Sequence, residues 1–176
     1  MKSAFKMGLL SLAIAGMAAS GSALADATLK ITGTIKASPC EVDASDSNNT
    51  INVNLGDNIE AVSLANAGSA TDWVAVTLSL KNCPDTTTNA IASFTGTAAT
   101  ETNATDMYQN TGTAENVQIE LQDKESGERK GNGSTMEAVV SANAASFPLQ
   151  ARAYTAQGGA RPGNIEGSVQ VSFTYQ

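Results

Sequence analysis

Cys40 and Cys83 are the residues of this sequence whose chemistry is most easily stated, because the chain contains no other cysteine. They are too far apart for a redox-active C-x-x-C pair and too few for a four-cysteine zinc or iron–sulfur site. The chain has no histidine, so Ser-His-Asp and Cys-His nucleophilic pairs and imidazole metal sites are excluded. What the two cysteines do therefore depends on the redox compartment of the protein.

The acidic and basic residues offer weaker candidates. Asp43, Asp46 and Asn48 superficially suggest a calcium loop, but the glycine and the closing glutamate of an EF-hand are missing at the required spacing. The stretch from Lys124 to Lys130 is typical of a solvated hairpin turn, and Arg152 of a charge on a strand face. No carboxylate pair is marked as that of a hydrolase. We therefore expect no catalytic residue, no metal and no cofactor.

The charge balance bears on the partners of the protein. The sequence has 10 Lys+Arg against 17 Asp+Glu, a formal net charge of -7. A protein that binds duplex nucleic acid needs a basic face to displace the counterions of the phosphates. The acidic balance argues against nucleic acid as a partner and favours solubility.

The first 25 residues have the pattern of a secretory signal peptide. Lys2 and Lys6 form a positive head, an apolar run follows from Met7 to Ala19, and Ala23-Leu24-Ala25 is an A-x-A cleavage pattern. This run is too short to span a hydrocarbon core of ~30 Å comfortably, which disfavours the alternative of an uncleaved membrane anchor. We expect residues 1–25 to be removed and the mature chain to be exported. In an oxidising compartment the two cysteines are expected to form a structural disulfide.

The mature chain is expected to be all-β. Apolar residues alternate with polar ones over 27–35, 74–80, 117–121 and 169–175, and no long helical stripe is present. Shorter candidate strands cover 51–55, 90–95, 136–140 and 147–154. The stretches between them, such as 43–50, 98–114, 124–134 and 157–164, are rich in Thr, Asn, Ser and Gly, as turns are. Several short strands in a chain of this length predict a β-sandwich without an internal linker.

Several short motifs, taken in order, carry a family resemblance. An alternating segment leads from Asp26 to Cys40, and the strand Val76–Lys81 precedes Cys83. Phe94–Ala98, Asn116–Asp123 and Pro148–Tyr154 follow. The end of the chain is the most specific part, with Gly163 ahead of a final alternating strand and Tyr175 as the penultimate residue. With these motifs the mature chain resembles the type 1-like fimbrial subunits, or pilins, of the chaperone–usher family.

The resemblance implies an incomplete immunoglobulin-like β-sandwich (the pilin fold) with one disulfide between Cys40 and Cys83. Residues 26–36 would be an N-terminal donor-strand extension, and residues 37–176 the pilin domain. The donor residues are Ala27, Leu29, Ile31, Gly33 and Ile35. The acceptor groove, which would contact a chaperone or a neighbouring subunit, comprises Gly163, Ile165, Gly167, Val169, Val171, Phe173 and Tyr175.

As a pilin, the protein would be a structural subunit of an extracellular bacterial fimbria that polymerises by donor-strand complementation and exchange and supports adhesion. The resemblance implies neighbouring pilin subunits, a periplasmic chaperone and an outer-membrane usher as partners. It also implies export through the periplasm to the cell surface. No enzymatic activity is expected.

Two alternatives of different kinds stay open on the sequence. One is a receptor-binding tip adhesin, which would lack the donor segment that residues 26–36 are expected to supply. The other is a self-contained secreted sandwich that binds a glycan or a protein, or acts as a hydrolase. In that case 27–35 would be the first strand of its own domain, and the domain would be stable alone.

Overall fold

The computed structural model describes residues 30, 32–36, 38–44 and 48–176. The chain divides into two units, Met1–Thr34 and Ile35–Gln176, which are considered separately. The expected signal peptide, residues 1–25, and the donor positions Ala27, Leu29 and Ile31 lie outside the described residues. The boundaries expected after residues 25 and 36 therefore stay predictions.

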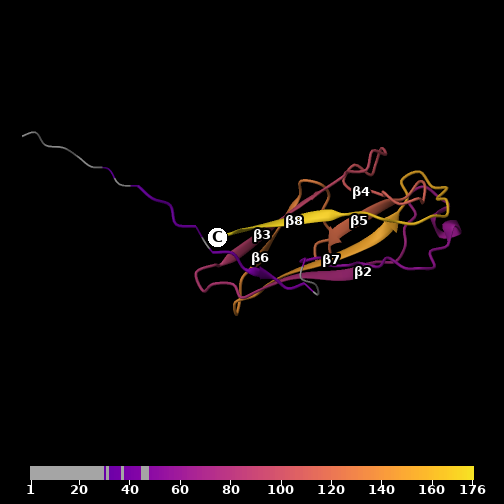
Figure 1. Ribbon diagram of the computed structural model, residues 1–176. Helices are drawn as coiled ribbons and strands as arrows, with labels where there is room; N and C mark the ends of the chain where they lie inside the picture. The colour runs from indigo at the N-terminus through magenta and orange to yellow at the C-terminus, as the bar shows by residue number, and fades with distance from the viewer. Residues whose placement is uncertain (1–29, 31, 37, 45–47) are drawn as a thin grey trace, which may run out of the picture. The chain divides into compact units, whose positions relative to one another are not determined.

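The unit Ile35–Gln176 is built from strands in two sheets (Figure 1). The five-stranded sheet has the order β1-β2-β7-β5-β4, and the three-stranded sheet has the order β6-β3-β8. The strands are β1 (Glu41–Val42), β2 (Val74–Lys81), β3 (Asn89–Gly96), β4 (Tyr108–Gln109), β5 (Gln118–Asp123), β6 (Thr135–Val139), β7 (Ala145–Tyr154) and β8 (Val169–Tyr175). All the strand pairs within the sheets are antiparallel. The expected all-β class is confirmed.

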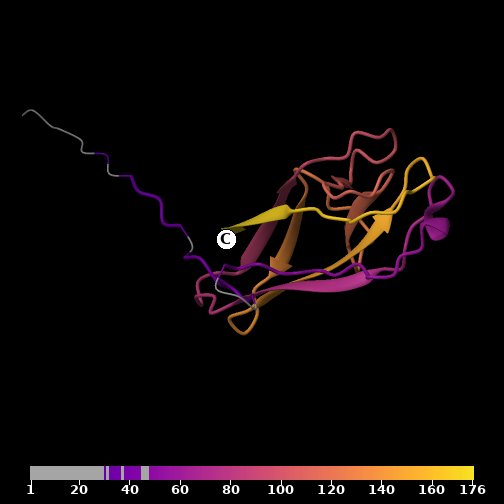
Figure 2. The same ribbon diagram turned by 45° about the vertical axis from the view of Figure 1, so that its right-hand side comes forward.

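The two sheets face each other across one main core, as the turned view shows (Figure 2). Alternation along β7 sends every second residue inward, and Phe147, Leu149 and Ala151 are buried against Leu78 and Leu80 of β2. From the other sheet, β3 contributes alternate residues in the same way. The period of two that was visible in the sequence is thus the period of burial.

The disulfide joins Cys40 to Cys83, as predicted. It connects the residue before β1 with the second residue after β2, and both cysteines are buried. On the chain-entropy argument a bridge over this sequence separation stabilises the fold by about 4 kcal/mol. The disulfide therefore compensates in part for a core that contains few large aromatic residues.

Two expectations about local structure were wrong. The expected strand over 51–55 forms no ladder, although Ile51 and Leu55 still pack against the core. The polar stretch 98–114, expected as a turn region, instead carries β4 with the buried Tyr108 and three further buried residues, Ala99, Ala104 and Met107. These pack with Tyr154 and Ala156 into a small cluster of their own. Apolar pattern alone could not find it, because its buried residues are few and mostly small.

Among the residues that the structure describes, no helix is long and apolar enough to cross a membrane. The one helical element there is a short 3-10 turn, η1 (Ala61–Leu64), which buries Leu64. Leu64 packs with Val117 and Ala153 at one end of the unit.

Candidate functional site

The last strand, β8, forms one edge of the three-stranded sheet. It pairs with β3 along one side, and no strand among the described residues pairs with its other side. Gln176 and Asn89 exchange both main-chain hydrogen bonds, which fixes the alternation along the antiparallel ladder. By that alternation the N–H and C=O groups of Val169, Val171, Phe173 and Tyr175 point away from β3. In the part of the chain that the structure describes, this edge therefore presents unpaired main-chain groups over the full strand.

The same four residues direct their side chains toward the core and leave them half-buried, while Gln170, Ser172 and Thr174 between them are exposed. The Phe173 ring lies 5.7 Å from the Phe147 ring between centroids. By contrast, Phe94 of β3 and Phe147 of β7 are fully buried. The core is thus covered beside β3 and only partly covered beside β8.

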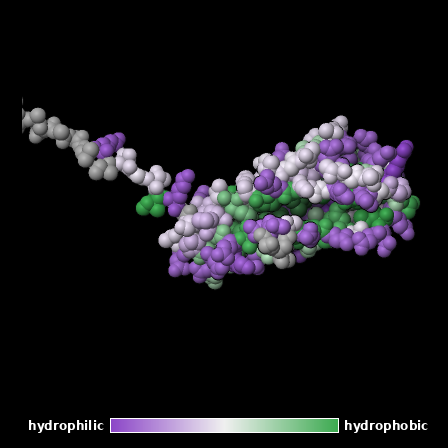
Figure 3. Space-filling model, in the orientation of Figure 1, coloured by the Kyte–Doolittle hydropathy of each residue, from purple (hydrophilic) through white to green (hydrophobic). Residues whose placement is uncertain are grey.

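This incomplete cover forms an apolar groove along β8. Figure 3 shows a hydrophobic band running along the face of the molecule level with β8. Other half-buried apolar residues pack on the same core from the remaining elements: Val42, Ile51, Leu55, Val76 and Ile119. The groove therefore combines a free strand edge with apolar side chains, which is the arrangement that accepts an added strand.

A small pocket of about 200 Å³ lies ahead of β8, among Ile59, Leu64, Val117, Pro162 and Ile165. Gly163 belongs to its wall, and a Cβ at this position would overlap the backbone of Ala114. The close approach is held by main-chain hydrogen bonds from Ala114 to Asn164 and from Thr111 to Glu166. Glycine is required here because the two chain segments touch.

At Gly167 a Cβ would overlap only the end of the flexible Ile119 side chain, so glycine is less strictly required there than at Gly163. The structure thus brings the seven expected acceptor residues onto one continuous segment, with the glycines at the close contacts and the apolar residues facing inward. At the other end, the Tyr175 hydroxyl lies 3.5 Å from the Cys40 carbonyl oxygen, to which it donates a hydrogen bond.

Two of the expected donor residues lie within the described part of the chain. Gly33 and Ile35 are both exposed, and the Ile35 side chain is exposed over its whole surface. The Ile35 side chain therefore does not fill the groove of its own unit. A fully exposed isoleucine leaves about 1.5–3 kcal/mol of burial free energy unused. The role of 26–36 as a donor strand stays a prediction.

Sequence reasoning missed the charged cluster on the outer face of the five-stranded sheet. Glu120 of β5 is buried and accepts hydrogen bonds from both Arg129 and Arg152. Arg129 also pairs with Asp106, and Arg152 lies 4.0 Å above the ring of Trp73. Arg152 does lie on a strand face, as expected, but it neutralises a buried carboxylate. The sequence did contain a signal: in β5 the polar residues Gln118 and Glu120 alternate with the apolar residues Ile119 and Leu121.

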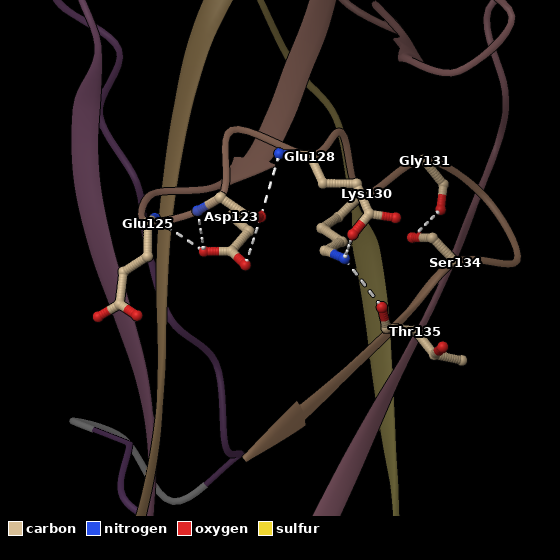
Figure 4. Close-up of polar contacts among 8 residues, drawn as sticks. Asp123, Glu125, Glu128, Lys130, Gly131, Ser134 and Thr135 are labelled. Carbon is tan, nitrogen blue, oxygen red and sulfur yellow. Dashed lines mark hydrogen bonds and ion pairs between the residues drawn. The ribbon is translucent and has the colours of Figure 1, made fainter.

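The stretch from Lys124 to Lys130 is a hairpin turn, as expected. The expectation that the whole turn is exposed to solvent was wrong. Lys130 is only 3% exposed, and its ammonium donates to the Glu128 carboxylate and to the Thr135 carbonyl oxygen (Figure 4). The turn opens on Asp123, whose carboxylate accepts from Ser126 Oγ and from two main-chain N–H groups. Partial burial alone would raise the pKa of Asp123, but these hydrogen bonds outweigh it and the pKa is lowered.

Comparison with known proteins adds three findings. Residues 29–176 match the family model described as fimbrial protein. Protein FimG of Escherichia coli K12 is 40% identical over 97% of each chain, and the S-fimbrial adhesin protein SfaS of an E. coli O6 strain is 36% identical over 85% of each. The crystal structure of the P pilus rod subunit PapA superposes with a TM-score of 0.61 at 15% identity, covering 79% of this chain and all of PapA. At that identity the likeness to PapA concerns the fold.

Proposed function

Because this chain belongs to the fimbrial protein family, we propose that its groove receives a strand from the neighbouring subunit of the fibre. The chain is a structural pilus subunit, exported to the cell surface as part of fimbriae, and its fold is the immunoglobulin-like sandwich of pilins. The observation that carries the proposal is β8, whose free main-chain groups and inward apolar side chains come from the same four residues.

The incoming strand is the segment 26–36 of another copy. Its residues Leu29, Ile31 and Ile35 share one parity and would each contribute about 1.5–3 kcal/mol when buried in the groove. Main-chain hydrogen bonds to Val169, Val171, Phe173 and Tyr175 would add affinity without regard to side chains. The main-chain hydrogen bonds would contribute affinity along the whole strand, and the apolar side chains would contribute specificity.

Register follows from the side-chain alternation of the donor. A slip of one residue would turn Thr28, Lys30, Thr32 and Thr34 toward the groove in place of the apolar set. Gly33 interrupts the apolar series on the inward face and suits a point where two backbones approach closely. The incoming strand is therefore held in a single register.

Before assembly the groove needs another occupant, because an open apolar edge favours aggregation. We propose that a periplasmic chaperone fills it first and that exchange for the donor segment takes place at an outer-membrane usher. The expected cleavage of residues 1–25 fits export by this route. We propose no catalytic function, since the family is structural. The relation to an S-fimbrial adhesin supports a contribution to adhesion by the finished fibre.

The test is a thermal melt of residues 37–176 with the disulfide intact, with and without a peptide of residues 26–36. We expect a soluble but unstable domain whose melting temperature rises sharply with the peptide. Peptides carrying Leu29→Lys or Ile31→Lys should fail, while Thr32→Lys, on the opposite face, should still act. A domain that melts cooperatively alone and does not respond to the peptide would overturn strand exchange. It would favour the self-contained secreted module instead.

A further inference from the structure

The opposite edge of the three-stranded sheet is β6, and it too has no strand partner on its outer side among the described residues. Phe94 donates a main-chain hydrogen bond to Ser134, which fixes the alternation between β3 and β6. By that alternation Thr135, Glu137 and Val139 turn their N–H and C=O groups away from β3. Their side chains are exposed, and Val139 is 72% exposed.

The outward main-chain carbonyl of Thr135 already has a hydrogen-bond partner. The buried ammonium of Lys130 donates a hydrogen bond of 3.0 Å to the Thr135 carbonyl oxygen, as Figure 4 shows. The main-chain groups of Glu137 and Val139 have no such cap in the described part of the chain. The open part of the edge is therefore short, and it lies at the end of β6 that leads into β7.

This open part borders a cleft of about 660 Å³ between β6, the end of β2 and the beginning of β7. β6 and β7 are joined by the tight turn 140–144 but belong to different sheets, so the cleft opens where they diverge. Its walls include the apolar side chains of Leu80, Met136 and Pro148. An added strand on β6 would thus lay one row of side chains on an apolar surface.

The charge of the cleft is strongly one-sided. Four carboxylates border it, from Asp43, Asp123, Glu125 and Glu137, against a single ammonium, that of Lys81. Lys81 is already paired with Asp43 at 2.7 Å, and the hydrogen bond to Asp43 raises the pKa of Lys81. The cleft therefore keeps an excess of negative charge at neutral pH and complements a cationic ligand.

We propose that this cleft docks a basic extended peptide segment of another protein as an added strand on β6. Its main chain would pair with Glu137 and Val139, and its lysine or arginine residues would face the surrounding carboxylates. A second copy of this chain is the less suitable occupant, because two such edges would bring Glu137 against the same acidic cluster and the whole chain carries -7.

The test uses purified fibres of the full mature chain and short blocked probe peptides, labelled for fluorescence anisotropy. We expect a peptide of alternating lysine and valine to bind, a peptide of alternating glutamate and valine not to bind, and binding to weaken with added salt. Glu137→Lys should raise the Kd at least about tenfold, as expected for reversing a charge beside the ligand. Glu60→Lys is the matched control, since Glu60 is exposed and does not border the cleft.

Strand addition, as opposed to loose attraction to acidic groups, has its own signature. Hydrogen exchange at the amides of Glu137 and Val139 should slow at least about tenfold when the basic peptide is bound. A lysine–valine peptide with a central proline should bind more weakly, because it lacks one N–H donor. Equal binding of acidic and basic probes, an unchanged Kd in Glu137→Lys, or unprotected amides in β6 would each overturn the proposal.

Discussion

The two edges of the three-stranded sheet are treated in opposite ways. β8 is seven residues long, carries no charged side chain and offers apolar residues at alternate positions. β6 is five residues long, carries Glu137 and has one carbonyl capped by Lys130. Free strand edges pair readily with other chains, and short length and charge are the common means of preventing it. The fold therefore disfavours pairing of β6 with another copy of this acidic chain, whereas β8 stays open to an apolar strand.

A change away from both edges gives the baseline for this comparison. Glu120→Ala removes the buried carboxylate that neutralises Arg129 and Arg152 on the outer face of the five-stranded sheet. We expect a loss of about 3 kcal/mol in the free energy of unfolding, because Arg152 loses its carboxylate partner and Arg129 keeps only the exposed Asp106. The loss should be the same with and without donor peptide, measured by urea unfolding. A loss that depends on the peptide would show that β5 is coupled to the groove.

Phe173→Ala tests the β8 edge directly. In the domain filled by the donor peptide it should cost about 3 kcal/mol, as for a buried phenylalanine, and about half of that in the empty domain. Met136→Ala, on the inward face of β6, is the matched control and should cost the same in both states. Calorimetry of the two variants, each with and without peptide, measures the difference. Equal losses for Phe173→Ala in both states would contradict a groove that is completed by the donor.

Lys130→Met tests the protection of β6. The variant keeps the size of the side chain but removes the donor to Thr135, which should cost about 1 kcal/mol. With an uncapped carbonyl on the edge, light scattering should show more self-association of fibres at the same protein concentration. Lys124→Met, in the same turn but exposed, should leave both quantities unchanged. If both variants behave alike, Lys130 does not protect the β6 edge from self-association.

Tyr108→Phe should have the smallest effect. The ring of Tyr108 lies where a Cβ on Gly96 would be, beside the pair that Gly96 forms with Val169, and its hydroxyl is buried with no hydrogen-bond partner among the described residues. Removing that hydroxyl should leave stability at pH 7 unchanged or raise it by up to about 1 kcal/mol.

The same variant has a defined pH dependence. Burial raises the pKa of Tyr108 from its ordinary 10.0 to about 12. The folded state therefore keeps a proton that the unfolded state loses, and the wild-type protein should lose stability as the pH rises from 10 toward 12. Tyr108→Phe should lose less over this window, as measured by unfolding at each pH. A steeper alkaline loss in the variant would contradict a neutral, buried phenol.

Sequence could predict the parts of the fold in which one face is buried and the other exposed. The strands β2, β7 and β8 alternate cleanly, so their positions and inward faces were readable, and so was the disulfide. The inward-facing residues of β8 could be placed because they form the last alternating segment, and their role as an acceptor groove stays a prediction. Whether a donor strand occupies the groove could not be read from this chain alone.

The charged and irregular parts were not readable for a different reason. Glu120 and Lys130 are buried by segments distant in sequence, and their partners could be known only after the chain had folded. The stretch 51–55 has the apolar spacing of a strand but no strand partner among the described residues. The hydrophobic pattern of a segment shows which of its faces is apolar, whereas strand pairing depends on which other segment lies beside it.

The Cys40–Cys83 bond also determines how the unit responds to being pulled. Tension that enters along the chain ahead of Cys40 passes through the covalent sulfur–sulfur bond to Cys83. Residues 41–82, including β1 and β2, then lie outside the load path, and the short β1 ladder is never the link that yields. Force reaches β3 instead, the central strand of the three-stranded sheet, which forms seven residue pairs with β8 and five with β6. At this end the unit can therefore yield only by losing hydrogen bonds on both sides of a central strand.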